Sequence, residues 1–156
     1  MPIKSFRGKI SDYDAAIPGS GIDTISLHTN NGSTGYKIKK FQAIGTDPGV
    51  TAGGEHVVQI FTTPQTTASS QIDFSDQTLL GVVYVTDDSA GVGRVGDVII
   101  FDNMTFNQDI FVTHVDAGSG NKSCNYYIEL EQVKLALDEN TVATLKDIRN
   151  IDSQNV

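Results

Sequence analysis

Short stretches rich in β-branched and aromatic residues recur along the whole chain, and clusters of Gly, Asn, Asp and Ser separate them. This pattern is typical of strands joined by turns. It predicts eight strands: Ile3–Lys9, Ile22–Thr29, Gly35–Ile44, His56–Thr63, Leu79–Thr86, Asp97–Phe101, Asp109–Val115 and Asn125–Leu137. Eight strands within 156 residues favour an all-β domain, either a β-sandwich or a jelly roll.

The last of these strands alternates between apolar and polar positions. In 125-NYYIELEQVKLAL-137, Tyr126, Ile128 and Leu130 share one face while mainly polar residues share the other, so one face should be buried and the other wet. From Val133 onward the apolar residues fall on the opposite face. A β-bulge or a change of sheet near Gln132 would account for this reversal.

The spacing of apolar residues changes after this strand. The segment 138-DENTVATLKDIRNI-151 has apolar residues three apart behind Asp138, which stands in an N-cap position, and this spacing predicts a short helix. We expect 152–156 to be frayed and residues 1–156 to form one domain. This helix could contact another molecule or pack on its own core, as most amphipathic helices do. The candidate interface residues are Val142, Leu145, Ile148 and Ile151.

The charge balance limits the partners. With 11 basic and 19 acidic residues the formal net charge is −8, which repels nucleic-acid phosphates and anionic lipid headgroups. Neither nucleic acid nor a membrane is therefore expected to bind. No stretch of 18 apolar residues occurs, and the start, 1-MPIKSFRGKISDYD-14, lacks the apolar core of a signal peptide.

The stretch 91-GVGRVG-96 has the G-x-G-x-x-G spacing of dinucleotide-binding loops. Such a loop must be followed by a helix whose N-terminus meets the pyrophosphate. The residues that follow, 97-DVIIF-101, favour a strand instead. We therefore interpret the glycines as a hairpin connection and expect no nucleotide cofactor.

Metal ligation is also not expected. The segment 96-GDVIIFDNMTFN-107 resembles the later half of a cupin metal motif but lacks its proline, glycine and histidine, and no His-x-His occurs. His28, His56 and His114 fall on separate predicted strands, and only the fold could bring them together. Cys124 is the single cysteine and is predicted to be a buried thiol.

No other motif indicates catalysis. The carboxylate pairs in 12-DYD-14 and 87-DD-88 lack the surrounding oxygen ligands of a calcium loop, so solvated turns are the better interpretation. There is neither a nucleophile elbow nor a Walker loop. The chain has no Trp, which weakens a glycan-binding interpretation without removing it, because tyrosines can also stack on sugars.

The order of several segments resembles that of small virion structural proteins of marine tailed bacteriophages, including cyanophages. The segments are 23-DTISLHTNNGSTGYKIKKFQAIGTDPG-49, 56-HVVQIFTT-63, 79-LLGVVYVTDD-88 and 127-YIELEQVKLALDENTVATLKDIRNI-151. The resemblance implies a jelly roll or related β-sandwich without enzymatic activity, which assembles as a head decoration, fibre or tail component. It also implies a virion location after synthesis in the host bacterial cytoplasm.

We therefore expect a non-enzymatic virion protein that binds a capsid or tail protein and itself, with no catalytic, cofactor or metal residues. Edge strands support self-association, because few charges apart from 37-KIKK-40 would block their pairing. The alternative is a glycan-binding or host-surface domain, which requires a solvent-facing tyrosine near a groove. The candidates are Tyr13, Tyr36, Tyr84 and Tyr127. A metal-dependent β-barrel enzyme is the third hypothesis.

Overall fold

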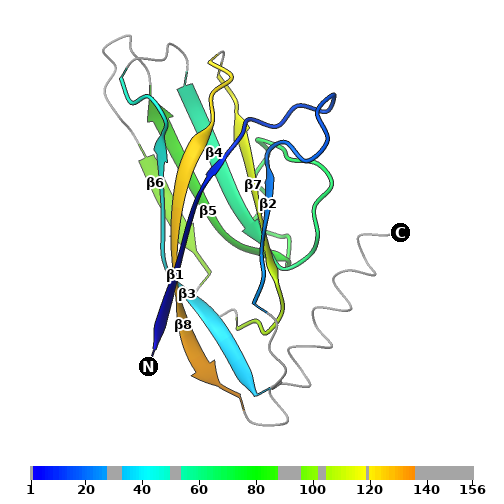
Figure 1. Cartoon of the computed structure of the whole chain (residues 1–156), viewed down its shortest axis with the longest axis vertical. Coiled ribbons are helices and arrows are strands. Elements are labelled where there is room, and N and C mark those ends of the chain that lie inside the picture. The colour runs from blue at the N-terminus through cyan, green and yellow to red at the C-terminus, as the bar shows by residue number, and fades with distance from the viewer. Residues whose placement is uncertain are drawn as a thin grey trace.

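The described residues form eight β-strands, and all eight lie where the sequence predicts them (Figure 1). The computed structural model describes residues 2–27, 33–49, 54–87, 96–101, 105–118 and 120–135, and these residues contain no helix. The strands are β1 (Ile3–Ile10), β2 (Ile22–Ile25), β3 (Thr34–Gly45), β4 (Gly54–Phe61), β5 (Leu79–Asp87), β6 (Gly96–Ile100), β7 (Ile110–Asp116) and β8 (Cys124–Lys134).

The strands form two antiparallel sheets. One has three strands in the order β1-β8-β3, and the other has five in the order β2-β7-β4-β5-β6. Figure 1 shows β8 beside β1 and β3, with β4, β5 and β7 side by side in the second sheet. The ladders join the first strand to the last, the second to the seventh and the fourth to the fifth. Strands from opposite ends of the chain are therefore neighbours.

One hydrophobic cluster contains side chains from both sheets. In β8 the alternation predicted from the sequence is confirmed, because Tyr126, Ile128 and Leu130 are all buried on the core side. Each strand contributes alternate residues because successive side chains point to opposite faces. The largest fully buried apolar side chains of the cluster are Tyr36, Phe41, Phe106, Ile10, Ile60, Leu80, Ile110, Ile128 and Leu130.

Strand β4 is buried on both faces. Its core side carries Val58 and Ile60, while the segment that follows the strand crosses its other side. The Gln59 side-chain amide donates to the backbone oxygens of Ser69 and Gln71, at 3.1 and 3.3 Å, and so holds this segment in place. The apolar, non-alternating sequence of β4 is the result of this double burial.

The irregularity expected near Gln132 lies elsewhere. The register shift is in β3, between Ile38 and Lys40, while Gln132 is paired in register with Tyr36. Val133, on the opposite face of β8 from Leu130, stays in register opposite Gly35. Leu135 lies beyond the last strand residue, and its backbone N–H donates to the Ser33 backbone oxygen. The alternation of side chains along β8 therefore does not set the direction of the Leu135 side chain.

Several sequence predictions fall outside the described residues. The predicted helix over 138–151 and the frayed end at 152–156 are among them. So are His28 and all but the last glycine of 91-GVGRVG-96. The same holds for the candidate interface residues Val142, Leu145, Ile148 and Ile151.

Candidate functional site

Two histidines meet in the core. His56 lies on β4 and His114 on the adjacent β7. His114 pairs with Val58, two residues along β4 from His56, so the two histidine side chains lie diagonally opposite each other on the same face of the sheet. Nδ1 of His56 lies 2.9 Å from Nε2 of His114, and the rings are stacked with centroids 5.1 Å apart. Both side chains are almost completely buried, at 2% and 0% exposure. Imidazoles without solvent must satisfy their polar atoms through one another or through the backbone.

Cys124 joins this pair from the other sheet. It is the first residue of β8, and its side chain is fully buried, as the sequence predicts. Its Sγ and a ring nitrogen from each histidine all lie within 4.8 Å of one another. The thiol also contacts the backbone oxygens of Ile44 and Asn125, at 3.6 and 3.5 Å. We call His56, His114 and Cys124 the His–His–Cys cluster.

The backbone fixes the tautomers of the histidine pair. Nδ1 of His114 lies 2.9 Å from the backbone oxygen of Ser11, which can only accept, so this nitrogen carries the proton. In the neutral ring Nε2 then presents its lone pair to His56, whose Nδ1–H donates to it. Burial lowers the pKa of His114 below its ordinary value and keeps the ring neutral near pH 7.

The aspartates on the segments next to the cluster accept hydrogen bonds from backbone N–H groups in the turns. Asp116 accepts hydrogen bonds from the backbone N–H groups of Glu55, Gly118 and Lys122. Asp12 accepts from the Asp116 N–H at 2.7 Å. In the same way Asp14 accepts from the Ala16 N–H at 2.9 Å. These contacts agree with the interpretation of 12-DYD-14 as a turn.

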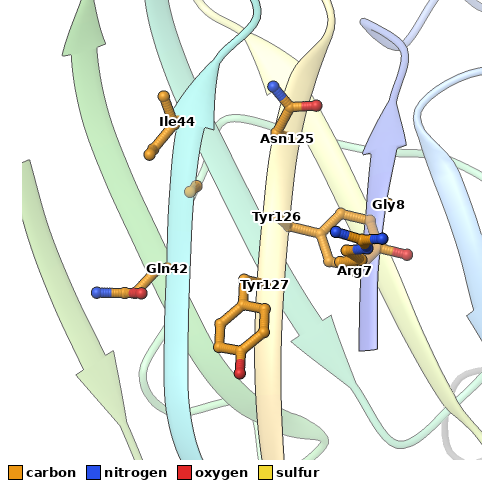
Figure 2. A pocket seen from close by; sticks show the side chains of 8 residues that line it. Arg7, Gly8, Gln42, Ile44, Asn125, Tyr126 and Tyr127 are labelled. Carbon is orange, nitrogen blue, oxygen red and sulfur yellow. The ribbon is translucent and has the colours of Figure 1, made fainter. Parts of the chain in front are cut away.

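A surface hollow of about 500 Å³ crosses the three-stranded sheet (Figure 2). Arg7 of β1 and Gln42 of β3 both pair with Tyr127 of β8, so these three side chains form one row across the sheet. Figure 2 shows the Tyr127 ring between Gln42 and Arg7, with Ile44 and Asn125 in the next row. The combination of an aromatic ring with amide and guanidinium groups suits a polar, ring-shaped ligand.

Of the four tyrosines considered from the sequence, Tyr127 alone lines this hollow, and it is half-buried. Its hydroxyl donates to a Glu129 carboxylate oxygen at 2.8 Å, and this hydrogen bond raises the pKa of Tyr127. Tyr36 is buried in the core and cannot reach a ligand. Tyr13 and Tyr84 are half-buried elsewhere.

Two further candidates from the sequence are the glycine motif 91-GVGRVG-96 and His28. Gly96, the last glycine of 91-GVGRVG-96, begins strand β6, so a strand and not a helix follows the motif, as predicted. His28 lies outside the described residues, so its position relative to His56 and His114 is not described.

The chain matches no protein-family model, and it has no significant match among curated protein sequences. In the part of the chain that the structure describes, no helix has the length and apolar character needed to cross a membrane.

Proposed function

We propose that this chain is a non-enzymatic structural protein of a phage virion that associates with copies of itself and docks on a capsid or tail protein. Two observations support the proposal. The first is the resemblance of the sequence to small virion proteins of marine tailed phages. The second is the edge strand β6, which carries the proposal because it offers an apolar surface suited to assembly.

The sheet edges differ in charge. Basic side chains on an edge strand oppose pairing with another chain. Strand β1 carries Lys4, Arg7 and Lys9, and β3 carries Lys37, Lys39 and Lys40. Strand β6 instead carries Val98 and Ile99, which are 48% and 40% exposed, and Asp97 is its one charged residue. Within the described residues β6 pairs with β5 alone and ends the five-stranded sheet, and its outer edge is the one on which we propose that another chain pairs.

We also propose that the fold is a jelly roll. In that architecture a long antiparallel hairpin is wrapped around a core, so strands pair from the ends of the chain inward. The pairs of β1 with β8, β2 with β7 and β4 with β5 follow this rule. The remaining nested partners are β3 and β6, but β6 extends the five-stranded sheet, and Tyr36 of β3 pairs with Phe106 instead. This arrangement leaves β6 at an edge.

The double variant Val98→Lys/Ile99→Lys is expected to convert a defined oligomer into a monomer, because it places a lysine on each face of the edge strand and charges on an edge strand oppose pairing with another chain. Light scattering after size-exclusion chromatography measures the mass. The matched control is Ile3→Lys, which changes an isoleucine that is 52% exposed on the basic edge strand β1 and should leave the oligomer intact. A wild-type monomer at all concentrations would contradict self-association.

The interface predicted from the sequence has its own variant. Leu145→Asp/Ile148→Asp tests the predicted C-terminal contact without touching β6. If this variant is monomeric and the β6 variant is not, self-association stands and uses the C-terminal residues. If both remain oligomeric, both proposed interfaces are wrong.

The virion location is tested separately. Mass spectrometry of purified phage particles should detect the chain, and its gene should lie beside capsid or tail genes. Absence from the particles of a phage that expresses it would contradict the proposed function.

A second candidate function is glycan binding, favoured by the position of Tyr127 in the surface hollow. If glycans bind there, Tyr127→Ala should lower affinity roughly 5- to 150-fold, since stacking of a ring on an aromatic side chain contributes about 1–3 kcal/mol. A glycan array followed by titration of any hit measures this loss. The control is Tyr84→Ala, because Tyr84 does not line the hollow. An array without hits removes this candidate.

A further inference from the structure

The geometry points to a metal site that the sequence does not predict: His56, His114 and Cys124 bind one Zn²⁺ ion that joins the two sheets. All three side chains are buried, and they come from β4 and β7 of one sheet and β8 of the other, so the ion would link the sheets. The inference is independent of the proposed virion role, and it holds equally for a glycan-binding protein.

The donor set suits zinc. Two imidazole nitrogens and one thiolate sulfur are ligands that Zn²⁺ prefers, and three protein ligands leave the fourth tetrahedral position to water. Hard cations such as Mg²⁺ and Ca²⁺ prefer oxygen ligands instead. A thiol is a weak hydrogen-bond donor, and the Cys124 contacts with Ile44 and Asn125 are long, so the sulfur loses little there when it turns to a metal.

Zinc binding needs a local adjustment of both histidines and of the cysteine. Tetrahedral zinc with ordinary bond lengths places two nitrogen ligands about 3.3 Å apart and a nitrogen and a sulfur about 3.6 Å apart. The paired nitrogens of His56 and His114 are 2.9 Å apart, and the three ligand atoms of the cluster lie within 4.8 Å. The histidines must separate by a few tenths of an ångström while the sulfur moves inward.

The outer hydrogen bond of one histidine is already in place. A zinc-bound histidine usually donates its other ring N–H to a backbone oxygen or a carboxylate, and His114 does so to Ser11. Its Nε2 lone pair therefore points into the cluster. When zinc replaces the proton between the rings, that proton moves to Nε2 of His56, and the Cys124 thiol releases its proton to solvent. Binding then releases one proton for each ion.

A hydrogen-bonded histidine pair without metal is the competing explanation. Such a pair satisfies Nδ1 of His56 and both ring nitrogens of His114, but it does not require a thiol from the opposite sheet within reach of both rings. The convergence of three ligands from three strands favours the zinc site.

The test uses the full chain after chelation and dialysis. Elemental analysis after zinc reloading should find one ion per chain. At zinc concentrations of 100 times the dissociation constant, the melting temperature should rise by about 5–10 °C. Cobalt loading should produce a thiolate-to-metal charge-transfer band, which reports Cys124 directly because it is the one cysteine.

Cys124→Ser and Cys124→Ala are the matched variants, since both keep a small residue in the core. Each should fold by circular dichroism, lose the charge-transfer band and bind zinc at least 10-fold more weakly, as loss of a ligand demands. The inference fails if the folded wild-type chain takes up no zinc and its melting temperature stays constant. It also fails if either cysteine variant binds zinc as tightly as the wild type.

Discussion

Phe41→Ala is expected to lower the free energy of unfolding by about 3–5 kcal/mol, which is the usual cost of removing a buried aromatic side chain. Phe41 is 1% exposed and belongs to the cluster shared by both sheets. Its ring lies near Gly81 on β5, so it links β3 of one sheet to the other. Its loss leaves a cavity between the sheets that the backbone cannot close. Urea unfolding measures the loss, and the melting temperature should fall by roughly 6–20 °C.

The matched control is Phe74→Ala. Phe74 is 54% exposed and contacts the Phe101 ring edge-on at a centroid distance of 5.4 Å. Its removal should cost about 0.5–1.5 kcal/mol, the value of an aromatic pair outside the core. Equal losses for Phe41→Ala and Phe74→Ala would mean that the two sheets do not share one core.

The strands could be predicted because their signals are local. Segments such as 79-LLGVVYVTDD-88 and 97-DVIIF-101 are rich in β-branched residues and lie beside turn-forming residues, and each became a strand. The order of the strands could not be predicted in the same way. Ile10 pairs with Cys124, and no pattern within either segment identifies the other as its partner.

The His–His–Cys cluster shows the same limit. Side chains alternate along a strand, so His56 shares a face with Val58 and Ile60, but the apolar run of β4 does not show which of its two buried faces meets the core. The contact with His114 depends on the pairing of β4 with β7, and the approach of Cys124 depends on the packing of one sheet on the other. A ligand set drawn from three strands leaves no spacing motif.

The surface hollow could not be predicted from the sequence either. Tyr127 could be named as a candidate from its residue type, but so could Tyr36, which the fold buries. What separates them is the register of β8 with its two neighbours, which places Arg7 and Gln42 on either side of Tyr127. A shift of one residue would have turned these side chains to the opposite face.

Gly21→Ala is the second substitution expected to have a large effect, about 2–5 kcal/mol of lost stability from backbone strain and overpacking together. Gly21 has a φ of +69°, which disfavours any side chain. An added Cβ would lie 2.6 Å from the Tyr13 Cβ and 2.8 Å from the His114 backbone oxygen, so both neighbours would have to move. The Gly21 backbone oxygen also accepts the His114 N–H at 2.9 Å. Denaturant unfolding measures the loss.

Gly19→Ala separates the two causes. Gly19 has a φ of +80°, but among the described residues no atom beyond its two chain neighbours lies within 4 Å of the place that an added methyl group would occupy, so this variant should lose about 1–2 kcal/mol from strain alone. The displacement caused by Gly21→Ala acts on β7 at His114, so it should also weaken zinc binding, whereas Gly19→Ala should leave zinc binding unchanged. Equal stability losses in the two variants would show that Tyr13 and β7 move away from the added methyl group at no cost in stability. In that case the segment around Gly21 does not hold the histidine in position.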